Sequence, residues 1–380
     1  MAFLSTKTGQ FTYFAQQLGE TNWRGKNVLD FGGNIGNILR DPNSTIDHDR
    51  YWCLDVVPES IEKGWAEFPE AHWNAASLRL LTGDLQRGWE EYEWRWKYKT
   101  MALARRNFSQ PQWGGEPIEG KTILLHSEQG LGDAIQFSRY APLVAARGAR
   151  VILEVDRRLQ TLMSSLDDVA QVLSAGDPLP EFDVHCPLLS LPRAFHTLLE
   201  TIPSHTPYLR APSDRLSKWN TRLRPKRGLR VGLIWSGNPA HHRDQARSIE
   251  LNALTPMFDV PATFFSLQKD MRAADAALLA GHKDVIQLAD ELADFSDTAA
   301  VMAQLDLIIS VDTSTVHLAG ALGRPVWILL PYLPDWRWLL ERDTSPWYPT
   351  ARLFRQDETR GWDSVIPRVQ AALSQMTAAT

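Results

Sequence analysis

The 380-residue sequence has few cysteines and no long apolar segment. Cys53 and Cys186 are far apart in apolar contexts, so neither a disulfide framework nor a cysteine metal site is indicated. No apolar run approaches the roughly 18 residues of a membrane-spanning helix, and the first residues lack a secretory signal pattern. We therefore expect a cytoplasmic protein without a transmembrane segment.

A strong excess of charge of either sign is also missing. Forty Lys and Arg against 45 Asp and Glu give a net charge of −5, which argues against a nucleic-acid partner. The 44% hydrophobic and 22% charged content is ordinary, and the length is sufficient for two to three domains with their own cores.

The most informative segment, VDTSTVHLAGALGRPVWILL at residues 311 to 330, predicts a strand end, a polar turn, a helix and a second strand. Asp312, Thr313, Ser314 and Thr315 supply hydroxyls and N-cap candidates where the helix begins. Free N–H groups and the helix dipole make such a start a favourable phosphate site. The segment therefore predicts a βαβ unit that binds a phosphorylated ligand, although an ordinary crossover with a polar turn would look similar.

Residues 27 to 57 predict another strand, glycine turn, helix and strand. The residues that could bind a nucleoside-bearing cofactor there are Gly32, Gly33, Gly36 and Asp55. This segment resembles the opening of a class I S-adenosylmethionine-dependent methyltransferase, but the later strands of that fold have no visible counterpart. We interpret it as a partial fragment whose cofactor residues are vestigial, so that S-adenosylmethionine binding is not expected.

The next segment predicts a pair of helices, the first ending at Gly83. Leu85, Trp89, Tyr92 and Trp96 are spaced 4, 3 and 4 apart, which predicts that all four lie on one face of the second helix. The pair resembles a single tetratricopeptide repeat, which needs a neighbour to cover its apolar face. It could therefore contact the rest of the chain or a partner protein. The Pro- and Gly-rich residues 111 to 120 predict a linker.

From residue 121 onward, predicted strands and helices alternate in two series. The polar run RLRPKRG, residues 222 to 228, separates them, so we expect two Rossmann-like halves. In the first half Asp133 follows Gly130 and Gly132, which places it in the first turn of a helix directly after a strand. A carboxylate there could cap the helix or act as a general base in a cleft between the halves.

Longer motifs resemble the heptosyltransferase-like glycosyltransferases of family nine that follow tetratricopeptide repeats. The motifs are QGLGDAIQFSRY at 129 to 140, DVHCPLLSLPRAF at 183 to 195, GLIWSGNP at 232 to 239, VDTSTVHLAGALGRPVWILL, and PDWRWLLERDTSPWYP at 334 to 349. They occur in the family's order over about two thirds of the chain.

The resemblance implies a glycosyltransferase of the B-type fold, with the donor nucleotide sugar held mainly by the second half and the acceptor by the first. It implies that Asp133 is the general base and that Thr313, Ser314, Thr315 and His317 form the diphosphate turn beside Asp312. Further donor-binding candidates on strand ends and loops are Asp312, Ser236, Asn238, Arg247, Gln268 and Lys269. Surface roles are at least as plausible for Arg247 and Lys269.

The predicted organisation has four parts: a methyltransferase-like fragment at 1–70, a helix pair at 71–110, an acceptor domain at 118–222 and a donor domain at 229–380. A helix start and cations can take the charge of a departing diphosphate, so we expect an inverting transferase without a metal or cofactor. The acceptor could be a glycan, a lipopolysaccharide or a protein. Two alternatives stay open: a bifunctional methyltransferase/glycosyltransferase, and a non-catalytic scaffold that binds nucleotide sugars or glycans.

Overall fold

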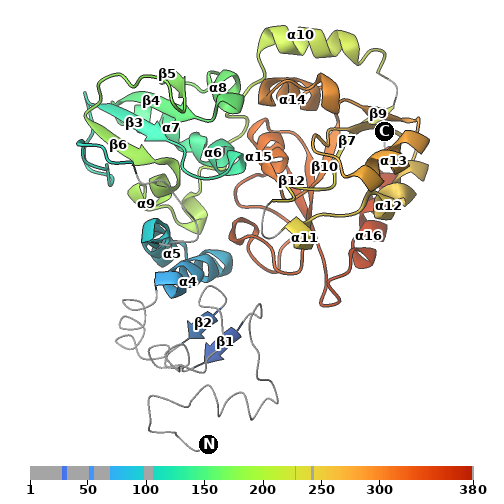
Figure 1. The fold of residues 1–380 in the computed structure, drawn as a ribbon, viewed down its shortest axis with the longest axis horizontal. Helices are drawn as coiled ribbons and strands as arrows, with labels where there is room; N and C mark the ends of the chain where they lie inside the picture. The colour runs from blue at the N-terminus through green and yellow to red at the C-terminus, as the bar shows by residue number, and fades with distance from the viewer. Residues whose placement is uncertain are drawn as a thin grey trace, which may run out of the picture. The chain divides into compact units, whose positions relative to one another are not determined.

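The computed structural model describes residues 28–31, 51–54, 69–97, 106–226, 228–240 and 244–378. The chain divides into two compact units, residues 1–106 and 107–380 (Figure 1). All the paired strands that are described run parallel, as expected for strands joined by helical crossovers.

The first unit contains a two-stranded sheet and a helix pair. Strand β1 (Val28–Phe31) pairs with β2 (Tyr51–Leu54) in parallel, at the positions where the sequence predicts two strands. The four cofactor candidates, Gly32, Gly33, Gly36 and Asp55, lie outside the described residues.

Helices α4 (Pro69–Thr82) and α5 (Leu85–Tyr92) form the predicted pair. Leu85, Trp89 and Tyr92 are buried, but the prediction that Trp96 continues this face is wrong. Beyond Tyr92 the chain tightens into the 3₁₀ helix η2 (Glu93–Lys97), in which residues three apart eclipse each other. Arg95 therefore follows Tyr92 into the buried stripe, with its guanidinium 5.3 Å from the Tyr92 ring centroid.

Gly88 allows α4 and α5 to approach closely. A methyl group added at Gly88 would lie 2.6 Å from Cδ2 and 2.8 Å from Cγ of Leu80, which is fully buried. We expect Gly88→Ala to lower the free energy of unfolding by about 1–3 kcal/mol, because overpacking outweighs the better helix propensity of alanine.

Chemical denaturation of the full chain measures this effect. The matched control is Gly281→Ala. Gly281 is also a helical residue, the last of α13, but a methyl group added there would have no atom within 4 Å. The control should be neutral or stabilising, and equal stability of the two variants would contradict close packing at Gly88.

The second unit begins with a four-stranded sheet in the order β5-β4-β3-β6. Its strands are β3 (Thr122–His126), β4 (Arg150–Val155), β5 (Val169–Ser174) and β6 (Val184–Pro187). Its helices are α6 (Leu131–Phe137), α7 (Ala141–Ala145), α8 (Arg157–Met163) and α9 (Leu191–Ala194). The central strands β3 and β4 are apolar and largely buried. We call residues 107–212 the N-terminal half of this unit.

Residues 111–120 are a packed edge of this half, so the prediction of a linker is wrong. Gln112 forms an isolated parallel bridge with His185 of β6, and the Trp113 N–H donates to the His185 carbonyl at 2.8 Å. Trp113 and Ile118 are buried. The Pro and Gly content is typical of a linker, but the two apolar side chains hold the segment against the sheet.

The six-stranded sheet of the second unit has the order β12-β11-β10-β7-β8-β9. Its strands are β7 (Leu229–Ile234), β8 (Ala262–Ser266), β9 (Val285–Gln287), β10 (Leu307–Val311), β11 (Val326–Leu330) and β12 (Ala351–Arg355). After β7, the next strands in the sequence, β8 and β9, lie on one side of β7 in the sheet. The strands that follow them, β10, β11 and β12, lie on the other side of β7. The strand order therefore reverses between β7 and β10, which is where α/β sheets bind ligands at their carboxyl ends.

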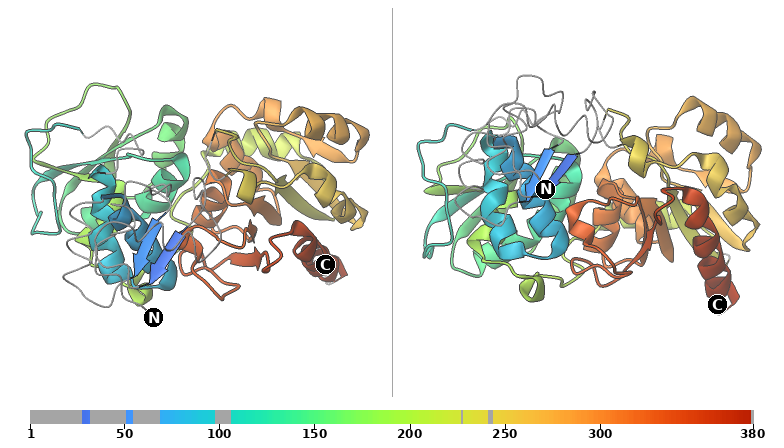
Figure 2. Two further views of the ribbon diagram at one scale, coloured as in Figure 1. Left: turned by 60° about the horizontal axis from the view of Figure 1, so that its bottom comes forward. Right: turned by 90° about the horizontal axis from the view of Figure 1, so that it is seen from below.

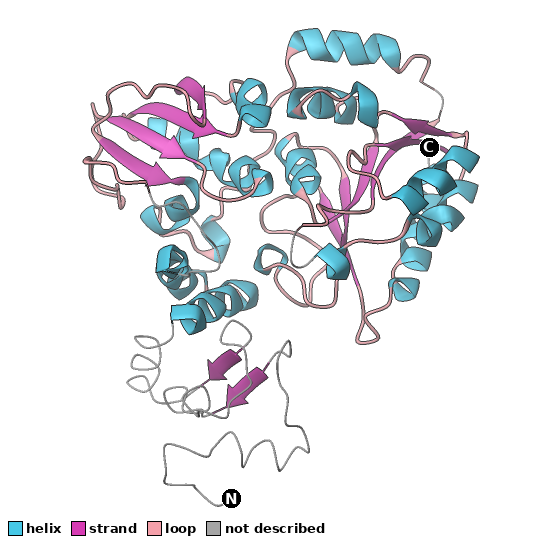
Figure 3. Cartoon of the chain, in the orientation of Figure 1, coloured by secondary structure: helices cyan, strands magenta, loops and turns pink. Residues whose placement is uncertain are grey.

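Helices cover both faces of this sheet (Figure 3). They are α11 (Asp244–Arg247), α12 (Leu251–Leu254), α13 (Ala273–Gly281), α14 (Phe295–Met302), α15 (Ser314–Ala321) and α16 (Ile366–Ala378). The last helix, α16, which is the red helix at the C-terminus in Figure 2, contributes apolar residues to the same core as α12. We call residues 228–378 the C-terminal half.

Helix α10 (Ser213–Arg222) connects the halves and packs on α14. The Trp219 indole, which is fully buried, donates to Asp297 Oδ1 at 2.7 Å. Arg215 and Lys218 add ion pairs to the same carboxylate, which therefore has a pKa below its usual value despite its burial. These contacts fasten the connecting helix to the C-terminal half.

Candidate functional site

The first turns of α6 and α15, one from each half, lie in direct contact. A methyl group added at Gly132 would lie 2.8 Å from Cδ2 of His317 and 3.3 Å from Cα of Ser314. Glycine is therefore required for this approach, and it brings the predicted base beside the predicted diphosphate turn. Both helices follow strands of parallel sheets, so each begins at the carboxyl edge of its sheet.

Asp133 stands at the third position of α6. Its Oδ2 accepts the Gly130 N–H at 2.8 Å, and its Oδ1 forms an ion pair with Arg337 of the C-terminal half. Burial raises the pKa of Asp133, while Arg337 acts in the opposite direction and the Asp335 carboxylate adds to the rise. The Asp133 side chain keeps 18% of its surface exposed.

The turn before α15 gathers hydroxyl groups. Thr313 is the N-cap residue, yet its side chain makes no capping hydrogen bond. Instead its Oγ1 lies 2.6 Å from Oγ1 of Thr315, which lies 3.1 Å from Oγ of Ser310. The first N–H groups of the helix are thus left for another acceptor, as an anion-binding turn requires.

Asp312 precedes this turn and has a pKa raised to about 6, chiefly by burial and then by the Asp335 carboxylate. His317, the fourth residue of α15, is buried, and its Nδ1 lies 3.0 Å from the Tyr348 hydroxyl. Burial and the nearby guanidinium of Arg337 lower the pKa of His317 to about 3. The ring is therefore neutral near pH 7.

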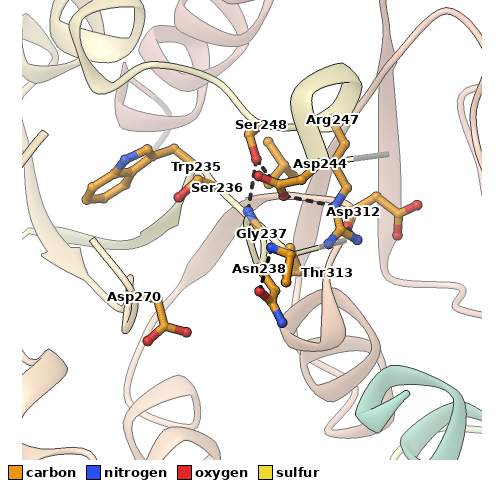
Figure 4. Close-up of polar contacts among 12 residues, drawn as sticks. Trp235, Ser236, Gly237, Asn238, Asp244, Arg247, Ser248, Asp270, Asp312 and Thr313 are labelled. Atoms are coloured by element: carbon orange, nitrogen blue, oxygen red, sulfur yellow. Dashed lines mark hydrogen bonds and ion pairs between the residues drawn. The ribbon is translucent and has the colours of Figure 1, made fainter. Parts of the chain in front are cut away.

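The loop after β7 supplies the other side of the switch point (Figure 4). The Gly237 N–H donates to Oγ of Ser248 at 3.0 Å, and Arg247 donates to the Asp312 carbonyl at 2.9 Å. Arg247 thereby connects the loops that follow β7 and β10. Asn238 is exposed, and its Oδ1 accepts the Ala240 N–H at 2.9 Å.

Ser236 is 3% exposed, and within the described part of the chain its hydroxyl has no hydrogen-bond partner. An unmatched hydroxyl at a strand end can donate to a ligand or a water molecule without disturbing the fold. Ser236 thus has a buried hydroxyl that a ligand could use.

The structure gives Gln268 and Lys269 internal partners. Gln268 Oε1 accepts the N–H groups of Trp235 and Ser236, each at 3.0 Å, and its Nε2 donates to the Ser236 and Asp270 carbonyls. Lys269 donates to the Leu292 carbonyl. The Gln268 amide therefore shapes the loop that carries Ser236.

Three residues near the site were given no role by sequence reasoning. Arg337 reaches Asp133, Arg139 lies buried between the halves, and Tyr348 contacts His317. Arg337 and Tyr348 belong to the motif PDWRWLLERDTSPWYP, so the motif marked the segment without revealing what its side chains contact.

Within the described ranges, no group of three or more His, Cys, Asp or Glu side chains is arranged to hold a metal ion.

In the same part of the chain, no helix combines the length and apolar character needed to cross a bilayer.

The sequence is similar to a known protein family and to a known protein. Residues 258–331 match glycosyltransferase family 9 (heptosyltransferase). Protein FlbA of Caulobacter vibrioides is 25% identical over 327 residues, which are 80% of this chain and 54% of that protein. The chain thus spans about half the length of this curated relative.

Two solved structures are similar. The glycosyl transferase family 9 protein from Veillonella parvula has a TM-score of 0.53 and 11% identity, covering 70% of this chain and 100% of that one. E. coli ADP-heptose lps heptosyltransferase II has a TM-score of 0.49 and 16% identity, covering 67% and 99%. The predicted fold class, α/β with two Rossmann-like domains of the glycosyltransferase B type, is confirmed by the parallel sheets and by the likeness to the Veillonella structure. The family match is confined to residues 258–331.

Proposed function

We propose that the chain transfers a sugar from a nucleotide-diphosphate donor to an acceptor hydroxyl or amide, with inversion and without a metal. The observation that carries this proposal is the contact of α6 and α15 through Gly132. It places the Asp133 carboxylate and the hydroxyl-rich turn at Thr313 on opposite sides of one seam between the halves. A base and an anion-binding turn in this arrangement are what a single displacement at a glycosyl diphosphate needs.

The donor diphosphate would bind at the switch point of the six-stranded sheet. The N–H groups at the start of α15, the Thr313 hydroxyl and the Ser236 hydroxyl supply donors, and Arg247 supplies positive charge. These groups would stabilise the negative charge that grows on the leaving diphosphate. This set of donors supports a reaction in which no metal takes that charge.

Asp133 would remove the proton from the acceptor. Asp133 belongs to the N-terminal half, so the acceptor would bind to that half. The donor would bind to the C-terminal half. A glycan, a lipopolysaccharide or a protein all carry suitable nucleophiles, and the helix pair of the first unit offers a surface for a protein acceptor. A cytoplasmic location fits a nucleotide-sugar donor.

A panel of sugar nucleotides differing in base and sugar tests the proposal. Thermal shift identifies the donor that stabilises the protein, because ligand binding to the folded state raises its stability by mass action. Released nucleoside diphosphate, measured with glycan and protein acceptors, then reports transfer. The proposal fails if a donor that binds the protein does not release nucleoside diphosphate with any of the acceptors at any pH.

Thr313→Val tests the turn directly. It removes one hydroxyl while keeping a β-branched shape, so we expect donor affinity to fall about 10- to 100-fold, as for loss of a hydrogen bond to a charged group. Calorimetry with the donor measures it. Thr255→Val is the control, since the Thr255 hydroxyl donates only to the Asn252 carbonyl in an exposed turn; equal affinities for both variants would move the diphosphate away from Thr313.

The raised pKa of Asp312 predicts a pH dependence of donor binding. Above about pH 6 this carboxylate is ionised and repels the diphosphate, and below it is neutral. We expect donor affinity to rise about threefold to tenfold when the pH falls from 7.5 to 5.5, since one unit of pKa change corresponds to 1.36 kcal/mol. His317 does not contribute, because its pKa of about 3 keeps it neutral over this range.

Calorimetry with an intact sugar nucleotide is the measurement, because its diphosphate has no proton that titrates in this interval. Asp312→Asn should abolish the pH dependence and bind with the low-pH affinity at every pH. A variant that keeps the full dependence would assign it to another group.

A further inference from the structure

Arg337 connects the C-terminal half to the base. It lies in the 3₁₀ turn η9 (Trp336–Trp338), and its side chain is only 9% exposed. Its guanidinium forms ion pairs with Asp133 of α6 and with Asp335 (Nη1 to Oδ1, 2.8 Å), and its Nε donates to Oε1 of Gln136 at 2.7 Å. Two of these three partners belong to α6, so one cation fixes the orientation of the first turns of that helix.

The turn that carries Arg337 is itself held rigidly. The guanidinium lies 4.1 Å from the centroid of the Trp336 ring, and Trp338 is fully buried and stacks on His317 with centroids 5.5 Å apart. Asp335 caps the turn by accepting the Arg337 N–H at 3.1 Å. Arg337 is therefore anchored next to the diphosphate turn, although it acts on a residue 204 positions earlier in the sequence.

Charged groups of both signs surround the base. Among the described residues, the charged and titratable groups around Asp133 are Arg139 beyond α6, Asp312 before α15, Arg247 of α11, His317 on α15, Asp335 before η9 and Arg337 on η9. His317 is neutral, so the carboxylates of Asp133, Asp312 and Asp335 share the region with these three arginines. Arg139 donates to Pro203, Trp347, Tyr208 and Gln136, so that, within the part of the chain that the structure describes, Arg337 is the cation that pairs with Asp133.

We propose that Arg337 is a positioning residue, which holds the Asp133 carboxylate ionised and aimed at the acceptor only when the two halves are docked. This inference deepens the proposed transferase function and rests on it. The base belongs to one half and its counter-ion to the other. A separated pair of halves would leave Asp133 without its cation, so deprotonation of the acceptor is confined to the closed arrangement.

The test compares Arg337→Gln and Arg337→Lys with the control Arg352→Gln. Arg352 is an exposed arginine on β12 whose guanidinium lies 4.7 Å from the Phe354 ring centroid. We expect Arg337→Gln to lower kcat at pH 7 by about 100-fold and to shift the acidic limb of the kcat profile to higher pH, since the cation that lowers the pKa of the base is gone. Arg337→Lys should restore part of both, and donor affinity should change less than threefold.

Asp335→Asn supplies a test of opposite sign. Asparagine keeps the capping oxygen of η9 but removes the carboxylate that raises the pKa of Asp133, so the acidic limb should move to lower pH. This variant also covers the case in which Arg337→Gln does not fold. If Asp335→Asn and the folded Arg337 variants leave the limb where it is in the wild type, the inference is overturned.

A second readout does not depend on turnover. Carboxyl ¹³C NMR of the full-length protein, with the Asp133 signal assigned by its loss in Asp133→Asn, follows the titration of the base directly. The Asp133 pKa should rise in Arg337→Gln and fall in Asp335→Asn. If these pKa shifts occur but the protein transfers no sugar, the proposed function is contradicted and the effect of Arg337 on Asp133 is supported. If the protein transfers sugar but the Asp133 pKa does not change in the variants, the role of Arg337 is contradicted.

Discussion

Asp133→Asn should lower turnover about 10²- to 10⁴-fold while donor affinity stays within a factor of three, as expected when a general base is removed. Asparagine keeps an oxygen that can accept the Gly130 N–H, so the start of α6 should be preserved. The measurement is kcat and donor affinity at several pH values, with folding checked by thermal unfolding.

Asp156→Asn is the matched control. Asp156 also stands at a helix start in the N-terminal half, where it caps α8 by accepting the Arg158 N–H at 2.9 Å. Its replacement should leave turnover unchanged. If both variants lose stability and keep turnover, Asp133 is a cap and the base must be sought elsewhere in the seam.

The pKa of Asp133 also sets the pH dependence of the wild type. Burial raises this pKa above the ordinary value of an aspartate, so the ionised, active form is lost as the pH falls through the raised value. We therefore attribute the acidic limb of the turnover profile to Asp133, and Asp133→Asn should remove that limb from the residual activity.

Those parts of the site that are local in sequence could be predicted. Asp133 and the residues from Asp312 to Thr315 each follow an apolar strand and precede a helix, and the carboxyl edge of a parallel sheet gathers such positions. The strand pattern thus indicated both sides of the seam. What it could not indicate is that Gly132 lets the two helix starts touch, because that contact depends on how the halves dock.

The side chains that act at a distance were missed for the same reason. Arg337 reaches Asp133 across 204 positions, and nothing in the segment DWRW specifies a partner. Local geometry also misled the predictions in one case: the change from an α-helix to a 3₁₀ helix after Tyr92 replaces Trp96 by Arg95 in the buried stripe. Hydrophobic periodicity assumes a constant rotation per residue and has no signal for such a change.

Arg139→Met should destabilise the second unit by about 3 kcal/mol, because buried acceptors lose their donor. Arg139 is 4% exposed, and it donates to the carbonyls of Pro203 (3.1 Å) and Trp347 (2.8 Å) and to the Tyr208 hydroxyl (3.1 Å). Methionine fills much of the same volume without a charge, so the loss would come from these unmatched polar atoms and not from a cavity.

The position of these acceptors gives the variant a second expected effect. Trp347 belongs to the C-terminal half, whereas Pro203 and Tyr208 belong to the N-terminal half, so one guanidinium fastens both halves. Arg147→Met is the control, since Arg147 is exposed and its guanidinium lies over the Phe195 ring at 4.1 Å. We expect this variant to lower the free energy of unfolding by less than about 1 kcal/mol.

Chemical denaturation of both variants, followed by donor calorimetry and turnover, separates the outcomes. Because Arg139 docks the halves without belonging to the donor turn, Arg139→Met should keep donor affinity and lose turnover along with stability, and a variant as stable as the control would show that the halves are held together by other contacts.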